Sequence, residues 1–264
     1  MFVVIFNHNQ NAAAIALRTS FAAISDVRLL DSGSQLSAEE RVAFDECHPN
    51  IYYGGLLNRA AELAASRESD EPVAIVCSDV GIADFQHFRD CLTSAFADPA
   101  VQVWAPCSQV DTFECMTPHR TGRLRRVTFV DGFCFAARKH LFDRVCPIDL
   151  SINRLGWGPD VQFGYCAAIL GGRCAVDDRV EVLHPGGSGY NRDAADKQYV
   201  EWRKTLGYPA RYFHRRSRKD RYQQGFGSRL VIAITFVMAR VYRLVRGIGA
   251  GSARGNAGAH LRSP

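Results

Sequence analysis

Two kinds of hydrophobic pattern alternate along the chain. Short continuous apolar runs, such as residues 2–6 and 73–76, predict buried strands, because a strand covered on both faces needs no polar alternation. Longer segments with apolar residues at helical spacing follow them, and this alternation predicts an α/β fold with a mainly parallel sheet flanked by helices. We expect strands at residues 2–6, 27–30, 73–76, 101–104, 127–130, 133–137, 174–176 and 180–183, and helices at residues 12–24, 56–66, 84–97, 139–145, 160–170 and 193–206.

Polar residues follow the first three predicted strands. Asn7 ends the first strand, the turn at residues 31–34 ends the second, and Ser78 and Asp79 end the third. In an open sheet with right-handed crossovers, ligands bind at the carboxyl ends of the strands, so these residues are expected at one edge. A plain turn would have the same composition as residues 31–34, and a single Asp after a strand is common.

The stretch from residue 156 to residue 190 carries chemistry at both of its ends. Asp160 falls in the first turn of a predicted helix, where the helix dipole favours a carboxylate. Gly171 and Gly172 end this helix, and the extended segment at residues 180–183 leads to His184 at a Pro-Gly-Gly break. Each residue alone is also compatible with a helix cap or with an ordinary histidine at a strand end.

Gly-Trp-Gly-Pro-Asp at residues 156–160, the helix closed by two glycines, the short strand and the histidine together resemble the acceptor-side half of family-2 glycosyltransferases of the GT-A fold. The resemblance implies a Rossmann-like GT-A domain in which Asp160 is the general base that deprotonates the acceptor hydroxyl. It also implies that His184 is a metal ligand. Pro159 stands where the family usually has Glu.

The N-terminal half resembles the same family at the donor site. The turn that begins at Asp31 is similar to the one that contacts the nucleotide base, and Asn58 follows a glycine-rich helix start that lines the nucleotide site. Asp79 matches the last residue of the family's Asp-X-Asp motif, whereas Cys77 replaces the first. The resemblance therefore implies Asn7, Asp31, Asn58, Ser78 and Asp79 at the donor nucleotide, Asp79 and His184 on a metal ion, and Trp157 and Gly158 at the sugar substrate.

The expected cofactor is Mg²⁺ or Mn²⁺, because a departing nucleoside diphosphate gathers negative charge that a hard, oxygen-bound cation neutralises. Trp157 could stack on a sugar ring, although a core position would fit it equally well. A helix start with tight packing is an equal alternative for Asn58.

Composition places the chain among ordinary globular proteins, with 264 residues, 47% hydrophobic and 22% charged. The nine cysteines form no Cys-X-X-Cys pair, and the sequence opens directly on a strand without the pattern of a signal peptide. These features favour reduced thiols and a cytoplasmic location.

Charge divides the chain unevenly. Residues 1–210 carry 20 Lys+Arg against 26 Asp+Glu, whereas residues 211–264 carry 12 against 1. We therefore predict a GT-A-like domain at residues 1–207, a basic amphipathic helical segment at 208–249 and a disordered tail at 250–264. The apolar run at residues 230–239 is far shorter than the roughly 20 residues that cross a bilayer.

An interfacial helix on an anionic membrane, at the inner face, is one interpretation of the basic segment. Packing on the body or on a second subunit is the other. Nucleic acid is not an expected partner, because the segment lacks a recognisable reading motif. The oligomeric state is left open.

The predicted function is inverting, metal-dependent transfer of a sugar, of the hexosyltransferase type, from a nucleoside-diphosphate donor to a glycan or lipid-linked acceptor in polysaccharide or glycolipid assembly. Two alternatives remain. The missing acidic residues fit a non-catalytic relative that binds nucleotide or glycan, and a similar sheet would also serve a nucleotidyltransferase. The sequence contains no Walker-type glycine loop.

Overall fold

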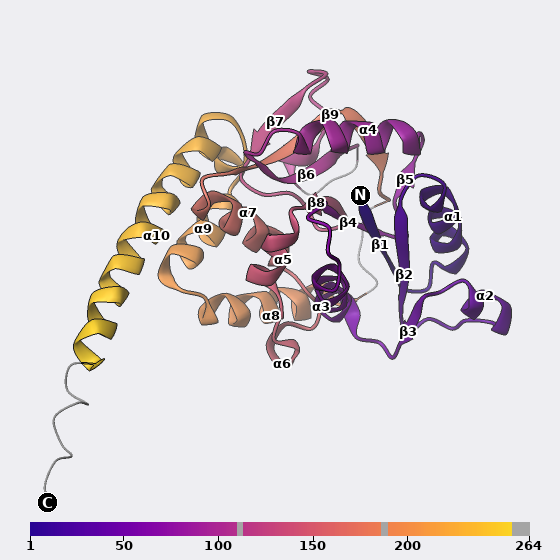
Figure 1. Ribbon diagram of the computed structural model, residues 1–264, viewed down its shortest axis with the longest axis horizontal. Coiled ribbons are helices and arrows are strands. Elements are labelled where there is room, and N and C mark those ends of the chain that lie inside the picture. The colour runs from indigo at the N-terminus through magenta and orange to yellow at the C-terminus, as the bar shows by residue number, and fades with distance from the viewer. Residues whose placement is uncertain (110–112, 186–189, 255–264) are drawn as a thin grey trace, which may run out of the picture.

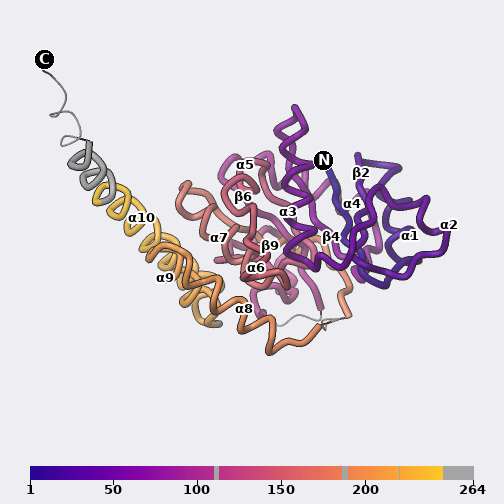
Figure 2. Tube along the Cα trace, turned by 90° about the horizontal axis from the view of Figure 1, so that it is seen from below, coloured from indigo at the N-terminus to yellow at the C-terminus, as the bar shows by residue number. Residues whose placement is uncertain are grey.

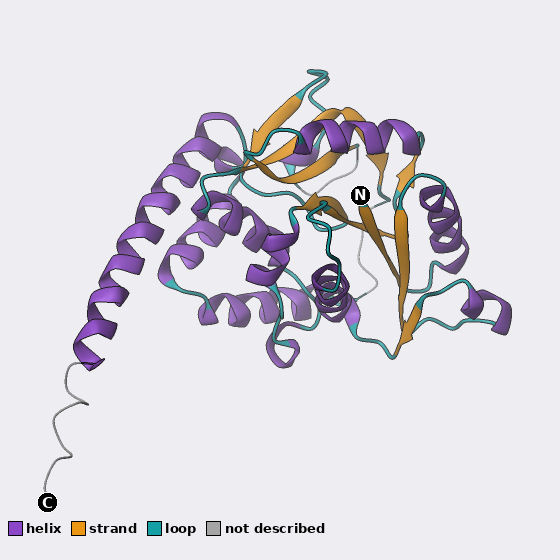
Figure 3. Ribbon diagram, viewed as in Figure 1, coloured by secondary structure: helices purple, strands orange, loops and turns teal. Residues whose placement is uncertain are grey.

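The computed structural model of the chain describes residues 1–109, 113–185 and 190–254. The strands of these residues are β1 (Phe2–Asn7), β2 (Asp26–Ser32), β3 (Glu46–His48), β4 (Val73–Cys77), β5 (Gly81–Ile82), β6 (Val101–Ser108), β7 (Leu124–Val127), β8 (Cys134–Ala137) and β9 (Arg173–Leu183). They form one sheet in the order β3-β2-β1-β4-β8-β6-β9-β5, with β7 paired to β9 (Figures 1 and 3). The first four strands in this order are parallel, and β8 is antiparallel to both of its neighbours. The predicted α/β class with a mainly parallel sheet is confirmed.

Helices cover both faces of the sheet. They are α1 (Asn11–Ala22), α2 (Ala38–Val42), α3 (Tyr52–Ala65), α4 (Phe85–Phe96), α5 (Lys139–Val145), α6 (Leu150–Asn153), α7 (Pro159–Ile169), α8 (Arg192–Thr205), α9 (Tyr208–Ser217) and α10 (Gly225–Arg254), with short 3₁₀ turns η1 (Glu114–Met116) and η2 (Asp220–Tyr222). On one face, Phe21 of α1 packs edge-on against Phe85 and Phe88 of α4. Right-handed crossovers place α3 on the opposite face, where α5 and α7 pack beside it (Figure 1).

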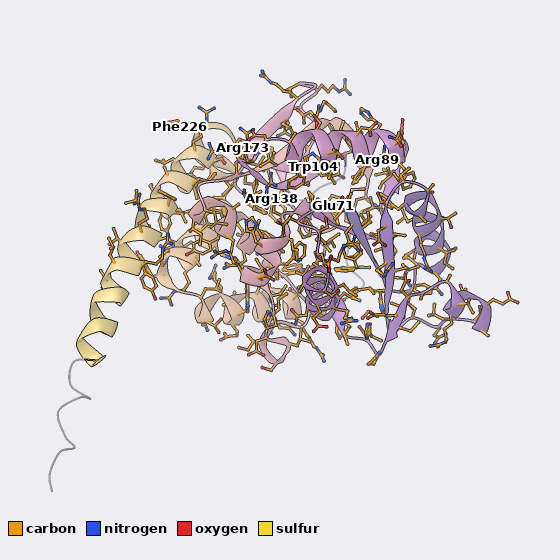
Figure 4. The ribbon with its side chains drawn as sticks, in the orientation of Figure 1. Glu71, Arg89, Trp104, Arg138, Arg173 and Phe226 are labelled. Carbon is orange, nitrogen blue, oxygen red and sulfur yellow. The ribbon has the colours of Figure 1, made fainter. Side chains whose placement is uncertain are left out.

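β9 is one long strand where two short extended segments were predicted. The prediction was wrong because Asp177 and Asp178, in the middle, have the composition of a turn. Asp177 is buried and accepts hydrogen bonds from Trp104 Nε1 at 3.1 Å and from Arg179 Nη2 at 2.7 Å. Trp104 lies in the interior of the body in Figure 4. Paired charges therefore allow the strand to continue where unpaired ones would end it.

Two other segments differ from the prediction. The strand expected at residues 127–130 is shifted to β7, which pairs antiparallel with β9. The arginines of β7 made this strand look like a polar loop in the sequence. Arg125 Nε donates a hydrogen bond to Asp178 Oδ1 at 2.8 Å, which holds the side chain in place. Residues 35–50, to which no element was assigned, contain α2 and the edge strand β3, with Ser37 capping α2 through its side chain.

The C-terminal helices belong to the packed body for much of their length. Phe213 of α9 and Val231 of α10 share a buried cluster with Val161 and Ala168 of α7. Packing therefore continues past the boundary predicted at residue 207, up to about the middle of α10. Beyond that point, as far as residue 245, α10 extends away from the body (Figure 2). Of the tail predicted at residues 250–264, only 250–254 are described, as the end of α10, and 255–264 lie outside the described residues.

A series of buried side-chain hydrogen bonds connects α9 to the body. His214 is fully buried, and its Nε2 lies 2.9 Å from Gln162 Oε1 of α7 while its Nδ1 lies 3.2 Å from the Tyr199 hydroxyl of α8. Burial is the main reason why the pKa of His214 falls from 6.5 to about 3, and Arg203 and Arg218 lower it further. The folded protein therefore holds a neutral imidazole at this position.

Acid is expected to destabilise the protein through His214. As the pH falls from about 6.5 towards about 3, His214 binds a proton in the unfolded chain but stays neutral in the folded chain. The free energy of unfolding therefore drops by about 1 kcal/mol per pH unit over this range. Denaturant unfolding of wild type and His214→Gln across this range measures the slope. The variant should show the shallower dependence, and a matched change at exposed His119 should leave the slope unaltered. Equal slopes in all three proteins would contradict this assignment.

Candidate active site

A cavity of about 890 Å³ opens at the carboxyl ends of β1 and β4. The chain leaves β1 towards β2 on one side, and β4 lies on the other side, so the cavity occupies the point where the strand order reverses. Seven predicted site residues line this cavity, although they come from four distant parts of the chain. They are Asn7, Ser78, Asp79, Trp157, Gly158, Asp160 and His184.

The pairing of β5 with β9 brings Asp79 and His184 together. These strands are antiparallel with Gly81 opposite Leu183, so the residues just before β5 meet those just after β9. His184 Nε2 lies 3.4 Å from Asp79 Oδ2, and its ring stacks on Phe133 at a centroid distance of 4.1 Å. The imidazole is thereby fixed in orientation beside the carboxylate.

One oxygen of the Asp79 carboxylate is left without a hydrogen-bond partner among the described residues. This oxygen, Oδ1, is buried, which is costly for a carboxylate unless another group binds it. The described parts of the chain contain no cluster of three or more His, Cys, Asp or Glu side chains placed to hold a metal. One carboxylate oxygen and one imidazole fit a divalent cation whose remaining ligands come from substrate and water. Burial raises the pKa of the neighbouring Cys77 thiol well above its ordinary value, so this side chain adds no negative charge.

Asp160 occupies the first turn of α7, as predicted. Gly158 precedes the helix with a φ of +102°, and a Cβ there would come within 2.5 Å of the Tyr199 ring, so only glycine fits this turn. Asp160 Oδ1 accepts a hydrogen bond from its neighbour Val161 N at 2.8 Å. Burial raises the pKa of the Asp160 carboxyl, while the positive charge of Arg218 partly opposes this shift. A raised pKa makes the carboxylate a stronger base.

An aromatic wall stands beside Asp160. Trp157 Nε1 donates a hydrogen bond to the Tyr190 hydroxyl at 2.9 Å, and the Trp157 carbonyl accepts one from Asn153 Nδ2 at 2.9 Å. The guanidinium of Arg218, just after α9, stacks over Tyr199 at 4.7 Å and lies 5.9 Å from the Trp157 ring. This wall therefore presents both a flat apolar surface and a positive charge to the cavity.

Asn7 lines the cavity on the β1 side, and Asp31 at the end of β2 supports it from behind. Asn7 Nδ2 donates to Asp31 Oδ1 at 2.8 Å, and Asp31 Oδ2 accepts from the backbone N–H of Ser34 at 2.9 Å. Asn7 lines the cavity, whereas Asp31 lies behind it and is not a lining residue. The structure thus shows Asp31 shaping the turn and orienting Asn7.

Asn58 does not lie at the cavity, contrary to the prediction. Its Nδ2 donates to the carbonyl of Ile148 at 2.9 Å, and its Oδ1 accepts from the N–H of the same residue at 2.6 Å. Both ends of the amide are used in fastening α3 to the segment before α6. The glycine-rich helix start has a different role, since a Cβ on Gly156 would come within 2.8 Å of the Gly54 nitrogen. Close packing of these glycines holds the Trp157 loop against α3.

Several cavity residues were missed by the sequence analysis. Arg218 lies in a strongly basic stretch that was interpreted as part of a tail, and Asp131 lies in a segment with the composition of a turn. Tyr53 donates a hydrogen bond to the Gly132 carbonyl at 2.7 Å, and burial raises the pKa of its hydroxyl well above the ordinary value. Other lining residues that were not predicted include His8, Phe113, Tyr190 and Arg192.

Solved structures of two glycosyltransferases are similar to the chain. GalNAc-T7, crystallised with UDP, GalNAc and Mn²⁺, is similar over 87% of this chain and 53% of its own, with 14% identity and a TM-score of 0.57. Glucosyl-3-phosphoglycerate synthase from Mycobacterium tuberculosis is similar over 75% of each chain. Its complex with Mn²⁺, UDP-glucose and phosphoglyceric acid gives 14% identity and a TM-score of 0.49. Its complex with Mn²⁺, UDP and glucosyl-3-phosphoglycerate gives 15% and 0.48.

A scan against protein-family models found no match, and no curated protein sequence is significantly similar to the chain. The similarity to GalNAc-T7, at this identity, establishes the fold alone. The chain has the GT-A fold that its motifs predicted. It spans about half the length of the GalNAc-T7 chain.

Proposed function

We propose that the chain is a metal-dependent glycosyltransferase that moves a sugar from a nucleoside-diphosphate donor to an acceptor hydroxyl with inversion at the anomeric carbon. The observation that supports this proposal most is that Asp160 and the Asp79–His184 pair line one cavity at the switch point of a GT-A sheet. The acceptor is a glycan or a lipid-linked molecule, and the setting is surface polysaccharide or glycolipid assembly at the cytoplasmic face of a membrane.

Asp160 acts as the base in this reaction. The acceptor oxygen forms a bond to the anomeric carbon, the bond from that carbon to the diphosphate oxygen breaks, and the acceptor proton passes to an oxygen of Asp160. The raised pKa of this carboxyl makes it a stronger base, as this role requires. Trp157 supplies an apolar face for the sugar, while Asn7 and Ser78 bind the nucleotide side of the donor.

Asp79 and His184 would hold Mg²⁺ or Mn²⁺. When bound, such a cation neutralises the charge that gathers on the departing diphosphate. Arg218 adds a fixed positive charge to the cavity near Asp160, where it attracts an anionic group of donor or acceptor and lowers the pKa of Asp160. Neither role needs the first acidic residue of the family motif, which Cys77 replaces.

A panel of nucleotide sugars, assayed for nucleoside-diphosphate release with Mn²⁺ and with candidate acceptors, tests the function. UDP-sugars are the first choice, because the GalNAc-T7 structure contains UDP. Release that depends on acceptor and on Asp79 supports the proposal. Nucleotide binding without release would instead identify a non-catalytic binding protein, and pyrophosphate release from a nucleoside triphosphate would identify a nucleotidyltransferase.

Arg218→Gln is expected to raise KM for the anionic substrate by about 10- to 100-fold, the size of a lost hydrogen bond to a charged group. It should also move the acid limb of the rate profile to higher pH, because the charge of Arg218 lowers the pKa of Asp160. Steady-state kinetics across pH measure both effects. Arg215→Gln, at an exposed position in the last turn of α9, is the matched control. Indistinguishable kinetics for the two variants would show that Arg218 takes no part in substrate binding or in setting the pKa of Asp160.

A further inference from the structure

Helix α10 has two apolar faces, of which the body covers one. Val231, Ile232, Thr235 and Ala239 are buried against the body, together with Ser228. Positions three and four apart share one side of a helix, so these residues form a single contact face. This face accounts for the packing of α10 on α7 and α9.

The opposite face carries a row of exposed apolar side chains that we name the apolar stripe. Its spacings of four, seven, four and three residues keep the row on one side of the helix. Phe226, at the start of α10 in Figure 4, is 80% exposed, Val237 59% and Leu244 67%. The complete stripe consists of Phe226, Leu230, Val237, Val241 and Leu244. Such a contiguous exposed row marks an interaction surface rather than scattered surface residues.

Basic residues accompany the stripe, and acidic residues are missing from the helix sequence. Arg229, Arg240 and Arg243 fall along one border of the stripe, and residues 225–254 contain no Asp or Glu. The preceding stretch, residues 211–221, adds six further Lys and Arg. The surface around the stripe is therefore strongly positive.

No helix in the described part of the chain is long and apolar enough to span a membrane. A second copy of this chain would also be a poor partner for the stripe, because pairing two such helices would bring their arginines together with no helix carboxylate to neutralise them. Anionic lipid head groups supply the missing charge, while the acyl region accepts the apolar side chains.

We propose that α10 docks on the surface of an anionic membrane, with the apolar stripe at the boundary between head groups and acyl chains and the arginines bound to lipid phosphates. The covered face keeps α10 attached to the body, so the helix lies along the membrane without crossing it. The part of α10 up to residue 245 extends away from the body beyond its packed half (Figure 2), which leaves room for this contact. The inference is independent of the sugar-transfer chemistry.

Flotation of the full chain with vesicles tests the proposal. The protein should float with phosphatidylcholine vesicles that contain phosphatidylglycerol, but not with phosphatidylcholine alone, and salt should weaken the binding. Val237→Glu combined with Leu244→Glu should lower the partition coefficient by about tenfold or more. Val42→Glu is the matched control, because Val42 is 84% exposed on α2 and remote from α10 in Figure 1.

Equal binding by the double variant and wild type would overturn the proposal, as would equal binding to both vesicle types. Analytical ultracentrifugation of the same proteins tests whether a second copy of the chain binds the stripe instead. A dimer that the double variant abolishes would assign the stripe to a second copy. Thermal unfolding establishes that the variants are folded. Unchanged nucleoside-diphosphate binding by the double variant separates loss of docking from damage to the cavity.

Discussion

Asp160→Asn is expected to lower kcat by about 10²- to 10⁴-fold, the usual contribution of a general base. The amide keeps the size of the side chain and can still accept the hydrogen bond from Val161 N, so the start of α7 should remain intact. Because an amide cannot take up the acceptor proton, the loss should fall on kcat. Donor affinity, measured by calorimetry with the nucleoside diphosphate, should change little.

The pH profile gives this prediction a second readout. The base works only when deprotonated, and burial raises its pKa, so wild-type activity should fall as the pH drops through that raised value. The Asn variant has no such group, and its residual activity should lose this acid limb. Asp131→Asn is the internal comparison, because Asp131 is a further carboxylate that lines the cavity. A large kcat loss at Asp131 with none at Asp160 would transfer the role of base to Asp131.

The sequence predicted the site residues that stand at the carboxyl ends of parallel strands. Asn7, Ser78 and Asp79 come after continuous apolar strands, and the carboxyl ends of such parallel strands meet at one edge. Asp160 and His184 were found because a helix start, a glycine stop and a strand end in this order resemble the acceptor-side half of family-2 glycosyltransferases. Each of these signals is local, so it can be read without knowledge of the packing.

The remaining residues depend on long-range packing. Arg218 reaches the cavity because α9 packs on α7 through buried Phe213 and His214. The sequence around these two residues is rich in arginine, so it does not show the apolar pattern that would predict this contact. Asn58 was misplaced because its partner, Ile148, lies 90 residues away. The β5–β9 register, which joins Asp79 to His184, rests on a strand of only two residues. Such a short strand has no detectable hydrophobic period.

Asp79→Ala is expected to abolish the effect of Mn²⁺ on nucleoside-diphosphate binding and to lower kcat/KM by about 100-fold or more, since charge neutralisation by a cation contributes several kcal/mol. The structural reason is the buried Oδ1 of Asp79, which no described residue satisfies. Calorimetric titration of UDP with and without Mn²⁺ measures the first effect without any turnover.

His184→Gln tests the second ligand of this pair. It should weaken Mn²⁺-dependent UDP binding less than Asp79→Ala does, because an amide oxygen can replace the imidazole nitrogen while the charge of Asp79 remains. Asp70→Ala, at an exposed position outside the cavity, controls for the loss of a carboxylate in general. If Asp79→Ala binds UDP with an unchanged dependence on Mn²⁺, the cation is held elsewhere. The 3.4 Å approach of His184 to Asp79 would then be an ordinary ion pair that fastens the end of β9 to the segment before β5.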